Sequence, residues 1–191
     1  MTRQYDLGRD LREAEAMVAG LENYLRGDSL YGSVGGGFSF QRMPAMTVGA
    51  LELRLRRLGQ LAGARVAELQ AQRDAVREAW PLHYRRKVER EAHSRLDTMG
   101  RYLQDMVGEP AQAARNWQPE LLRRSIVEEL RRVMARTQRH DDALEAKARQ
   151  IDALLLAIAD KPCGFLWDAQ LETIYPHADF PWLYRRPRAR D

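Results

Sequence analysis

Four histidines and one cysteine are the side chains of this sequence best suited to catalysis or metal binding. Glu89 and His93 stand four residues apart, which places both on one turn of a helix where they could share a metal ion. The sequence has neither the Glu-x-x-His spacing of di-iron carboxylate bundles nor the His-Glu-x-x-His motif. We therefore interpret Glu89 and His93 as members of a salt bridge and predict no metal site.

A second polar group, His140-Asp141-Asp142, contains the His-Asp pair found in metal phosphohydrolases. That chemistry needs several further His and Asp ligands from separate helices, and the chain offers few. His140 also falls on an apolar seam close to Thr137, so we interpret these two residues as a polar layer that sets the register between helices. Cys163 would need a placed histidine to act as a nucleophile. The sequence thus predicts no catalytic residue and no cofactor.

Glycines concentrate between residues 27 and 46, and Gly35, Gly36 and Gly37 are consecutive. Such a run could cradle a phosphate through its backbone N–H groups. The segment lacks both the Gly-Lys-Ser/Thr ending of a P-loop and the strand-to-helix context of a dinucleotide site. We expect a small hairpin or an ordered loop here, with a ligand loop as the alternative.

Basic residues suggest nucleic-acid contacts at two places. Trp80 is followed by Arg85, Arg86 and Lys87, and an aromatic face beside cations suits single-stranded nucleic acid. Glutamates are mixed into this stretch, so a solvated helix face is the alternative that we favour. The net charge is +4, and most of it comes from the end of the chain, which includes Arg188 and Arg190.

The residues before this basic end are of the types that anchor protein interfaces, namely Trp182, Tyr184, Arg185 and Arg186. They could contact a partner. The alternative is that the aromatic segment folds back and caps the helical core, with only the last five or so residues loose. The two interpretations are compatible.

Apolar residues at steps of three and four predict helices over about 6–26, 47–107 and 119–160. Pro81 interrupts the second helix, and we favour a kink over a tight turn because no turn-forming residues surround it. The third would be roughly 60 Å long and would need a partner along most of its length. Antiparallel packing against 47–107 would supply that partner.

The predicted fold class is all-α: an elongated antiparallel helical hairpin or bundle of coiled-coil type. A glycine-rich insertion covers 27–46, and an aromatic C-terminal segment follows over 161–191. We expect residues 1–160 to form a single helical domain.

Composition limits the location and the function. The longest apolar run, 153–159, is far shorter than the roughly 20 residues that cross a bilayer, so no membrane insertion is expected. A single cysteine cannot form an internal disulfide, and the cytoplasm is the expected location. We expect a non-catalytic interaction or scaffold protein that binds a protein partner or itself. The alternatives are an accessory nucleic-acid-binding protein and, last, a small-ligand binder or enzyme that uses the glycine-rich loop.

Overall fold

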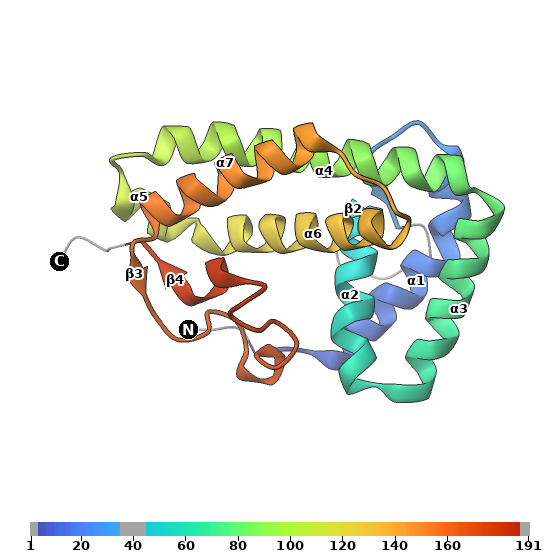
Figure 1. Cartoon of the computed structure of the whole chain (residues 1–191). Helices are drawn as coiled ribbons and strands as arrows, with labels where there is room; N and C mark the ends of the chain where they lie inside the picture. Colours follow the sequence, from blue (N-terminus) through green and yellow to red (C-terminus); the bar gives the residue numbers. More distant parts are fainter. Residues whose placement is uncertain (1–3, 35–44, 188–191) are drawn as a thin grey trace. The chain divides into compact units, whose positions relative to one another are not determined.

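The structure is a computed structural model that describes residues 4–34 and 45–187 (Figure 1). These residues form seven α-helices, two short 3-10 helices and two two-stranded antiparallel sheets, which confirms the all-α prediction. The helices are α1 (Leu7–Arg26), α2 (Val48–Leu61), α3 (Gly63–Ala79), α4 (Pro81–Met106), α5 (Pro110–Arg115), α6 (Trp117–Arg136), α7 (Asp142–Ile158), η1 (Ala169–Leu171) and η2 (Pro181–Tyr184). The strands are β1 (Gly32–Ser33), β2 (Ala45–Met46), β3 (Lys161–Pro162) and β4 (Arg185–Arg186).

Contacts divide the chain into two compact units. The described part of the N-terminal unit comprises residues 6–34, 45–91 and 129–137, and that of the C-terminal unit comprises residues 4–5, 92–128 and 138–187. Helices α4 and α6 contribute residues to both. The predicted boundary near residue 160 does not coincide with either unit, because the aromatic segment groups with α6 and α7 residues of the C-terminal unit.

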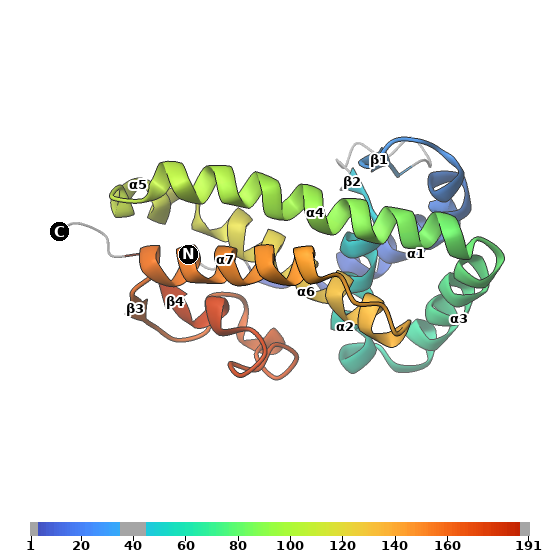
Figure 2. The same ribbon diagram turned by 45° about the horizontal axis from the view of Figure 1, so that its top comes forward.

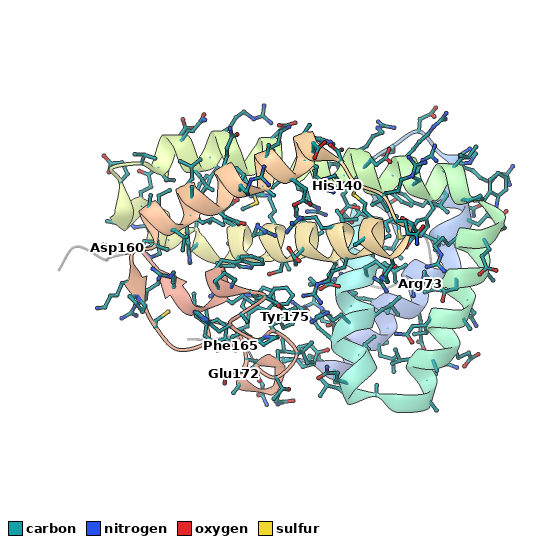
Figure 3. The ribbon with its side chains drawn as sticks, viewed as in Figure 1. Arg73, His140, Asp160, Phe165, Glu172 and Tyr175 are labelled. Atoms are coloured by element: carbon teal, nitrogen blue, oxygen red, sulfur yellow. The ribbon has the colours of Figure 1, made fainter. Side chains whose placement is uncertain are left out.

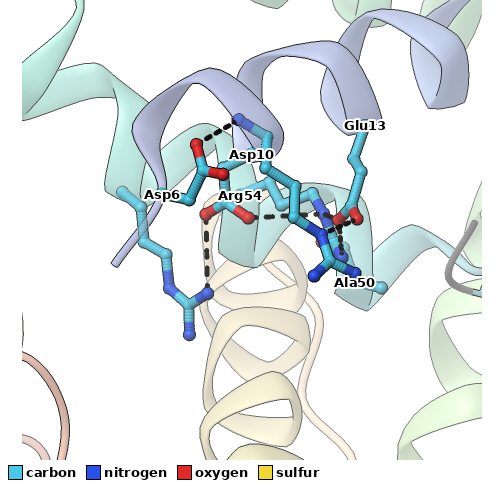
Figure 4. A network of polar contacts seen from close by, with 7 residues as sticks. Asp6, Asp10, Glu13, Ala50 and Arg54 are labelled. Atoms are coloured by element: carbon cyan, nitrogen blue, oxygen red, sulfur yellow. Dashed lines mark hydrogen bonds and ion pairs between the residues drawn. The ribbon is translucent and has the colours of Figure 1, made fainter. Parts of the chain in front are cut away.

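Helix α1 confirms the prediction for 6–26 and packs on α2 and α3 in the N-terminal unit. The side chain of Asp6 caps its first turn by accepting a hydrogen bond from the backbone of Arg9. The apolar face buries residues such as Met17 and Leu21. A network of charges joins this helix to α2 (Figure 4): Arg54 donates to Glu13 over 2.9 Å through Nε and lies 3.8 Å from Asp10.

The helix predicted over 47–107 with a kink at Pro81 is wrong, because the chain forms three helices there. Thr47 caps α2 by accepting a hydrogen bond from the backbone of Ala50 over 3.1 Å. The first break lies at Ala62 and Gly63, where Gly63 has a φ of +52° that favours glycine. The second lies at Trp80, after which Pro81 begins α4, where its missing N–H costs no hydrogen bond.

The single helix predicted over 119–160 is also wrong. The chain leaves the helix at Arg136 and resumes at Asp142. Gln138 has a positive φ of 53°, and Asp141 caps α7 by accepting a hydrogen bond from Leu144 over 2.9 Å. The polar layer predicted at Thr137 and His140 is therefore wrong, because both side chains are exposed at the break between the two helices, where Figure 3 labels His140.

The apolar periodicity nevertheless identified the buried faces on both sides of this break. In the C-terminal unit α7 lies beside the 92–106 part of α4, as Figures 1 and 2 both show. His93 contacts the capping Asp141 over 2.9 Å, and Lys147 donates to Asp97 over 2.6 Å. These polar contacts tie the two helices together at successive turns.

Arg124 is the charged centre of the C-terminal unit and is 1% exposed. Its Nε and Nη2 donate to Asp152 over 2.7 and 3.0 Å, and Nη1 donates to Glu128 over 3.2 Å. Its guanidinium carbon lies 3.9 Å from the centre of the Trp182 ring, a cation–π contact. A buried arginine thus links α6, α7 and the C-terminal segment.

The aromatic segment packs as a chain of edge-to-face rings, part of which is labelled in Figure 3. Contacts run from Trp167 to Tyr175, from Tyr175 to Phe180 and from Phe180 to Trp182, with ring centres 4.9 to 5.5 Å apart. Strands β3 and β4 pair antiparallel and close this segment. The segment therefore folds back on its own unit, as one of the two interpretations proposed.

Strands β1 and β2 pair antiparallel, so the glycine-rich insertion begins and ends as the predicted hairpin (Figure 2). The predicted ligand loop of Gly35, Gly36 and Gly37 lies outside the described residues.

Replacing Gly63 with alanine should destabilise the protein by about 1 kcal/mol, because an L-residue is strained at positive φ. Gly20→Ala is the matched control: Gly20 lies inside α1 with open space at its Cβ position, so alanine should stabilise the protein by up to about 1 kcal/mol. Chemical denaturation measures both. Equal signs for the two substitutions would contradict the assigned break.

Arg124→Ala should lower the free energy of unfolding by roughly 3 kcal/mol, because Asp152, Glu128 and the Trp182 ring lose their shared buried partner. Arg149, which is exposed on α7, provides the control. Its replacement with alanine should change stability by less than about 0.5 kcal/mol. Similar losses for both variants in urea denaturation would show that Arg124 does not hold the unit together.

Candidate functional site

A cleft of about 490 Å³ in the N-terminal unit brings four arginines together. Its walls come from α2, from α3 and from the part of α6 that belongs to this unit. The lining residues are Glu52, Leu55, Arg56, Gln70, Arg73, Glu129, Arg132, Ala135 and Arg136. The volume lies within the range of roughly 300–1,000 Å³ that is common for small-molecule sites.

Glu52 is the buried carboxylate around which this cleft is organised. It lies between Leu51 and Leu53 in the sequence and is 4% exposed. Its Oε1 accepts hydrogen bonds from the hydroxyl of Tyr84 over 2.7 Å and from Nη1 of Arg73. Its Oε2 lies 3.7 Å from Nη2 of Arg136. Because an unpaired buried carboxylate is costly, these partners are a condition for its burial.

Arg73, which Figure 3 labels, is held at the cleft by two carboxylates. Besides its bond to Glu52, its Nε lies 2.7 Å from Oδ1 of Asp74, an ion pair without hydrogen-bond geometry. Burial lowers the pKa of Arg73, whereas the charge and the hydrogen bond of Glu52 raise it. The net pKa lies above the ordinary value for arginine, so the guanidinium stays charged. Burial and the charge of Glu52 raise the pKa of Tyr84 well above its ordinary value of 10.0.

The second carboxylate of the cleft, Glu129, lies 3.4 Å from Nε of Arg56. The lining residues thus comprise four arginines and two glutamates, and the carboxylate of Asp74 adds a third negative charge beside Arg73. Exposure separates the arginines, since the Arg73 side chain is 7% exposed and that of Arg136 is 56% exposed. The cleft therefore has a fixed cation at its wall and an accessible one at its mouth.

The chemistry that this lining supports is the binding of anions. A guanidinium offers five donors in a planar fork that fits carboxylate and phosphate oxygens. The lining residues include no His, Cys, Ser or Thr that could act as a nucleophile or as a general base near neutral pH. Among the described residues, no cluster of three or more His, Cys, Asp and Glu side chains could hold a metal ion.

A larger groove of about 660 Å³ lies between α4 and α7 in the C-terminal unit. Its floor is formed by Leu96, Gly100 and Ile151, and the Lys147–Asp97 ion pair spans it. Leu96 and Ile151 are already buried. The exposed lining of this groove is mainly apolar, and Lys147 and Asp97 within it pair with each other, so the arginine cleft is the stronger candidate for a charged ligand.

The four residues that were predicted to contact a partner belong to the C-terminal unit, and most of them pack within it. Trp182 is buried, and its Nε1 donates to the hydroxyl of Ser125 over 3.0 Å. The Tyr184 hydroxyl donates to the backbone of Tyr175 over 2.9 Å. Arg185 and Arg186 form β4, and Arg186 is the one of the four predicted contacts that is exposed.

Of the predicted nucleic-acid residues, the structure describes Arg85, Arg86 and Lys87. Lys87 is buried, and its amine donates to the carbonyl of Gly27 over 2.7 Å, so it closes the end of α1. Arg86 is exposed, and Arg85 is half-buried. Arg188 and Arg190 lie outside the described residues.

Sequence reasoning missed the cleft because its arginines lie on three separate segments. Each of these segments contains or adjoins acidic residues and therefore resembles a solvated helix face. One signal was present: Glu52 stands between two leucines on a predicted apolar helix, where a charge must find a partner. Its partners, however, become neighbours only when the helices pack.

Comparisons with known proteins give no information about this site. No protein-family model matches the chain, and no curated protein or solved structure is similar to it. Within the described residues, no helix combines the length and the apolar character that a membrane span requires.

Tyr84→Phe should lower the free energy of unfolding near neutral pH by about 1–2 kcal/mol, because Glu52 loses one of its donors. The raised pKa of Tyr84 means that its contribution is complete below about pH 10 and is lost as the pH rises further. The variant should therefore lose less stability above pH 10 than the wild type. Urea denaturation across this range tests both effects, with Tyr31→Phe as an exposed control that keeps the wild-type profile.

Proposed function

We propose that this chain is a non-catalytic interaction protein of the cytoplasm, and that the arginine cleft takes up an anionic group of its partner. The observation that carries the proposal is that arginines from three helices line one cleft of ligand size and that the side chain of one of them, Arg136, is 56% exposed. Clusters of arginines are the usual means by which proteins bind acidic or phosphorylated groups. A cytoplasmic location agrees with the single cysteine of the chain.

A structural role for these charges is the rival explanation, and the α1–α2 network shows what such a role looks like (Figure 4). There the Arg54 side chain is 13% exposed and is fixed by Glu13, Asp10 and the carbonyl of Ala50. Arg136 also donates to a backbone carbonyl, that of Arg132 over 3.3 Å, but its contact with Glu52 is long and more than half of its side chain faces solvent. Its charge is available to a ligand.

Nucleic-acid binding and self-association are expectations separate from the anion site in the cleft. Arginines suit the phosphates of nucleic acid as well, but an extended polyanion needs a row of cations, and the cleft gathers its arginines around one point. Light scattering would detect self-association as a mass near twice that of the chain.

Binding of sulfate tests the proposal, with proton–nitrogen correlation spectra of the arginine side chains as the readout. At constant ionic strength, sulfate in place of chloride should shift the signals of the cleft arginines saturably. Arg136→Gln should weaken this binding about tenfold, because it removes a charge-assisted hydrogen bond.

The matched control is Arg65→Gln. Arg65 belongs to the same unit, is 54% exposed, and also pairs with glutamates, but it lies outside the cleft. Its replacement should leave sulfate affinity unchanged. An equal loss in both variants, or the absence of saturable shifts in the wild type, would refute the proposal.

A further inference from the structure

We propose that the groove between α4 and α7 in the C-terminal unit binds an amphipathic helix of a partner protein, and that this helix carries acidic residues along one edge. The groove is built within one unit and shares no residue with the arginine cleft. The inference therefore goes beyond the proposed function and does not depend on it.

The shape of the groove matches a helix. Helices α4 and α7 lie side by side here (Figures 1 and 2). They run in the same direction, because Asp97 pairs with Lys147 and, one turn further on, the Cβ position of Gly100 lies 3.4 Å from Cδ1 of Ile151. From the ion pair the lining continues for about two turns, or roughly 11 Å, along each helix. A furrow between two helices accepts the side-chain ridge of a third.

The lining offers apolar surface that the fold itself leaves uncovered. Leu96 and Ile151 are buried, but the other eight lining residues are at least partly exposed, among them Ala153 and Leu154 of α7. The run 153–159 at the end of α7 is entirely apolar, yet fewer than half of its residues are buried. The apolar stripe of a partner helix would remove this surface from water, as in other complexes in which a helix docks in a groove.

The rim of the groove determines the charge of the partner. Arg101 lines the groove and is exposed, and no carboxylate among the described residues pairs with it. Lys147 and Asp97 neutralise each other. Opposite charges across an interface fix the register and exclude wrong partners. A glutamate or aspartate at the edge of the partner helix that lies next to α4 would complement Arg101.

A second copy of the chain fits this groove less well than a separate helix does. In a two-fold dimer the same patch of both copies meets. Groove against groove would leave both concave surfaces unfilled, and it would bring one Arg101 near the other. A convex helix with an acidic edge has neither disadvantage.

Selection from a displayed peptide library tests the inference, with the full chain as the target. The library consists of helix-forming peptides of roughly 18 residues, or five turns. Leucine, methionine and alanine alternate along one stripe, and the positions beside the stripe vary between glutamate, lysine and glutamine. Selection should enrich glutamate along one edge, and the selected peptide should bind saturably in fluorescence anisotropy.

Charge reversal at the rim tests the predicted acidic edge. Arg101→Glu should weaken the selected peptide at least about tenfold and should instead favour its counterpart with lysines at the same edge. Arg149→Glu is the matched control, because Arg149 is exposed on α7 but does not line the groove.

A second pair of variants tests the apolar contact. Leu154→Gln should weaken the peptide about tenfold through loss of apolar burial. Leu156→Gln should leave the affinity unchanged, because Leu156 is 45% exposed on the same helix but lies outside the lining. Urea denaturation confirms that each variant folds.

Several results would overturn the proposal. Absence of saturable binding would exclude a helix in the groove, and enrichment of lysine would exclude the acidic edge. Equal affinity of the peptide for the wild type, Arg101→Glu and Leu154→Gln would place its site elsewhere. A mass near twice that of the chain, lost in Leu154→Gln but kept in Leu156→Gln, would assign the groove to a second copy. None of these results affects sulfate binding in the arginine cleft.

Discussion

The buried carboxylate of Glu52 sets the condition that the rest of the N-terminal unit has to meet. A charge in such a place requires partners, and these come from three other helices: Arg73 from α3, Tyr84 from α4 and Arg136 from α6. The packing of these helices is therefore tied to the placement of one charge. The same condition gathers arginines around one point and thereby creates the cleft.

Buried and exposed arginines have different roles. In the C-terminal unit Arg124 is enclosed by two carboxylates and the face of Trp182, so its donors and its π contact are used within the fold. In the cleft, Arg73 is likewise held by Glu52 and Asp74, whereas the Arg136 side chain is 56% exposed and its contact with Glu52 is long. We therefore assign Arg124 and Arg73 to the fold and propose that Arg136 serves a ligand.

Hydrophobic periodicity predicted the helical content and most buried faces, because burial of an apolar stripe depends on sequence spacing alone. It did not predict the breaks near Gly63 and Gln138, since the apolar pattern continues on both sides of each break and a single residue at positive φ leaves no mark on it. Pro81 was recognised as an interruption, but it starts a helix where a kink was expected. The cleft was beyond prediction for a further reason: Glu52, Arg73 and Arg136 are far apart in the chain, and the position of Glu52 between two leucines does not indicate which partners it finds.

The central claim is that Glu52 binds Arg73 for the sake of the fold and leaves Arg136 available. Double-mutant cycles on the free energy of unfolding test it directly, with Glu52→Gln combined in turn with Arg73→Gln and with Arg136→Gln. We expect a coupling of about 3 kcal/mol for the buried pair and of less than about 1 kcal/mol for the exposed one. A coupling to Arg136 as large as that to Arg73 would contradict the account, because it would show that both arginines serve the fold.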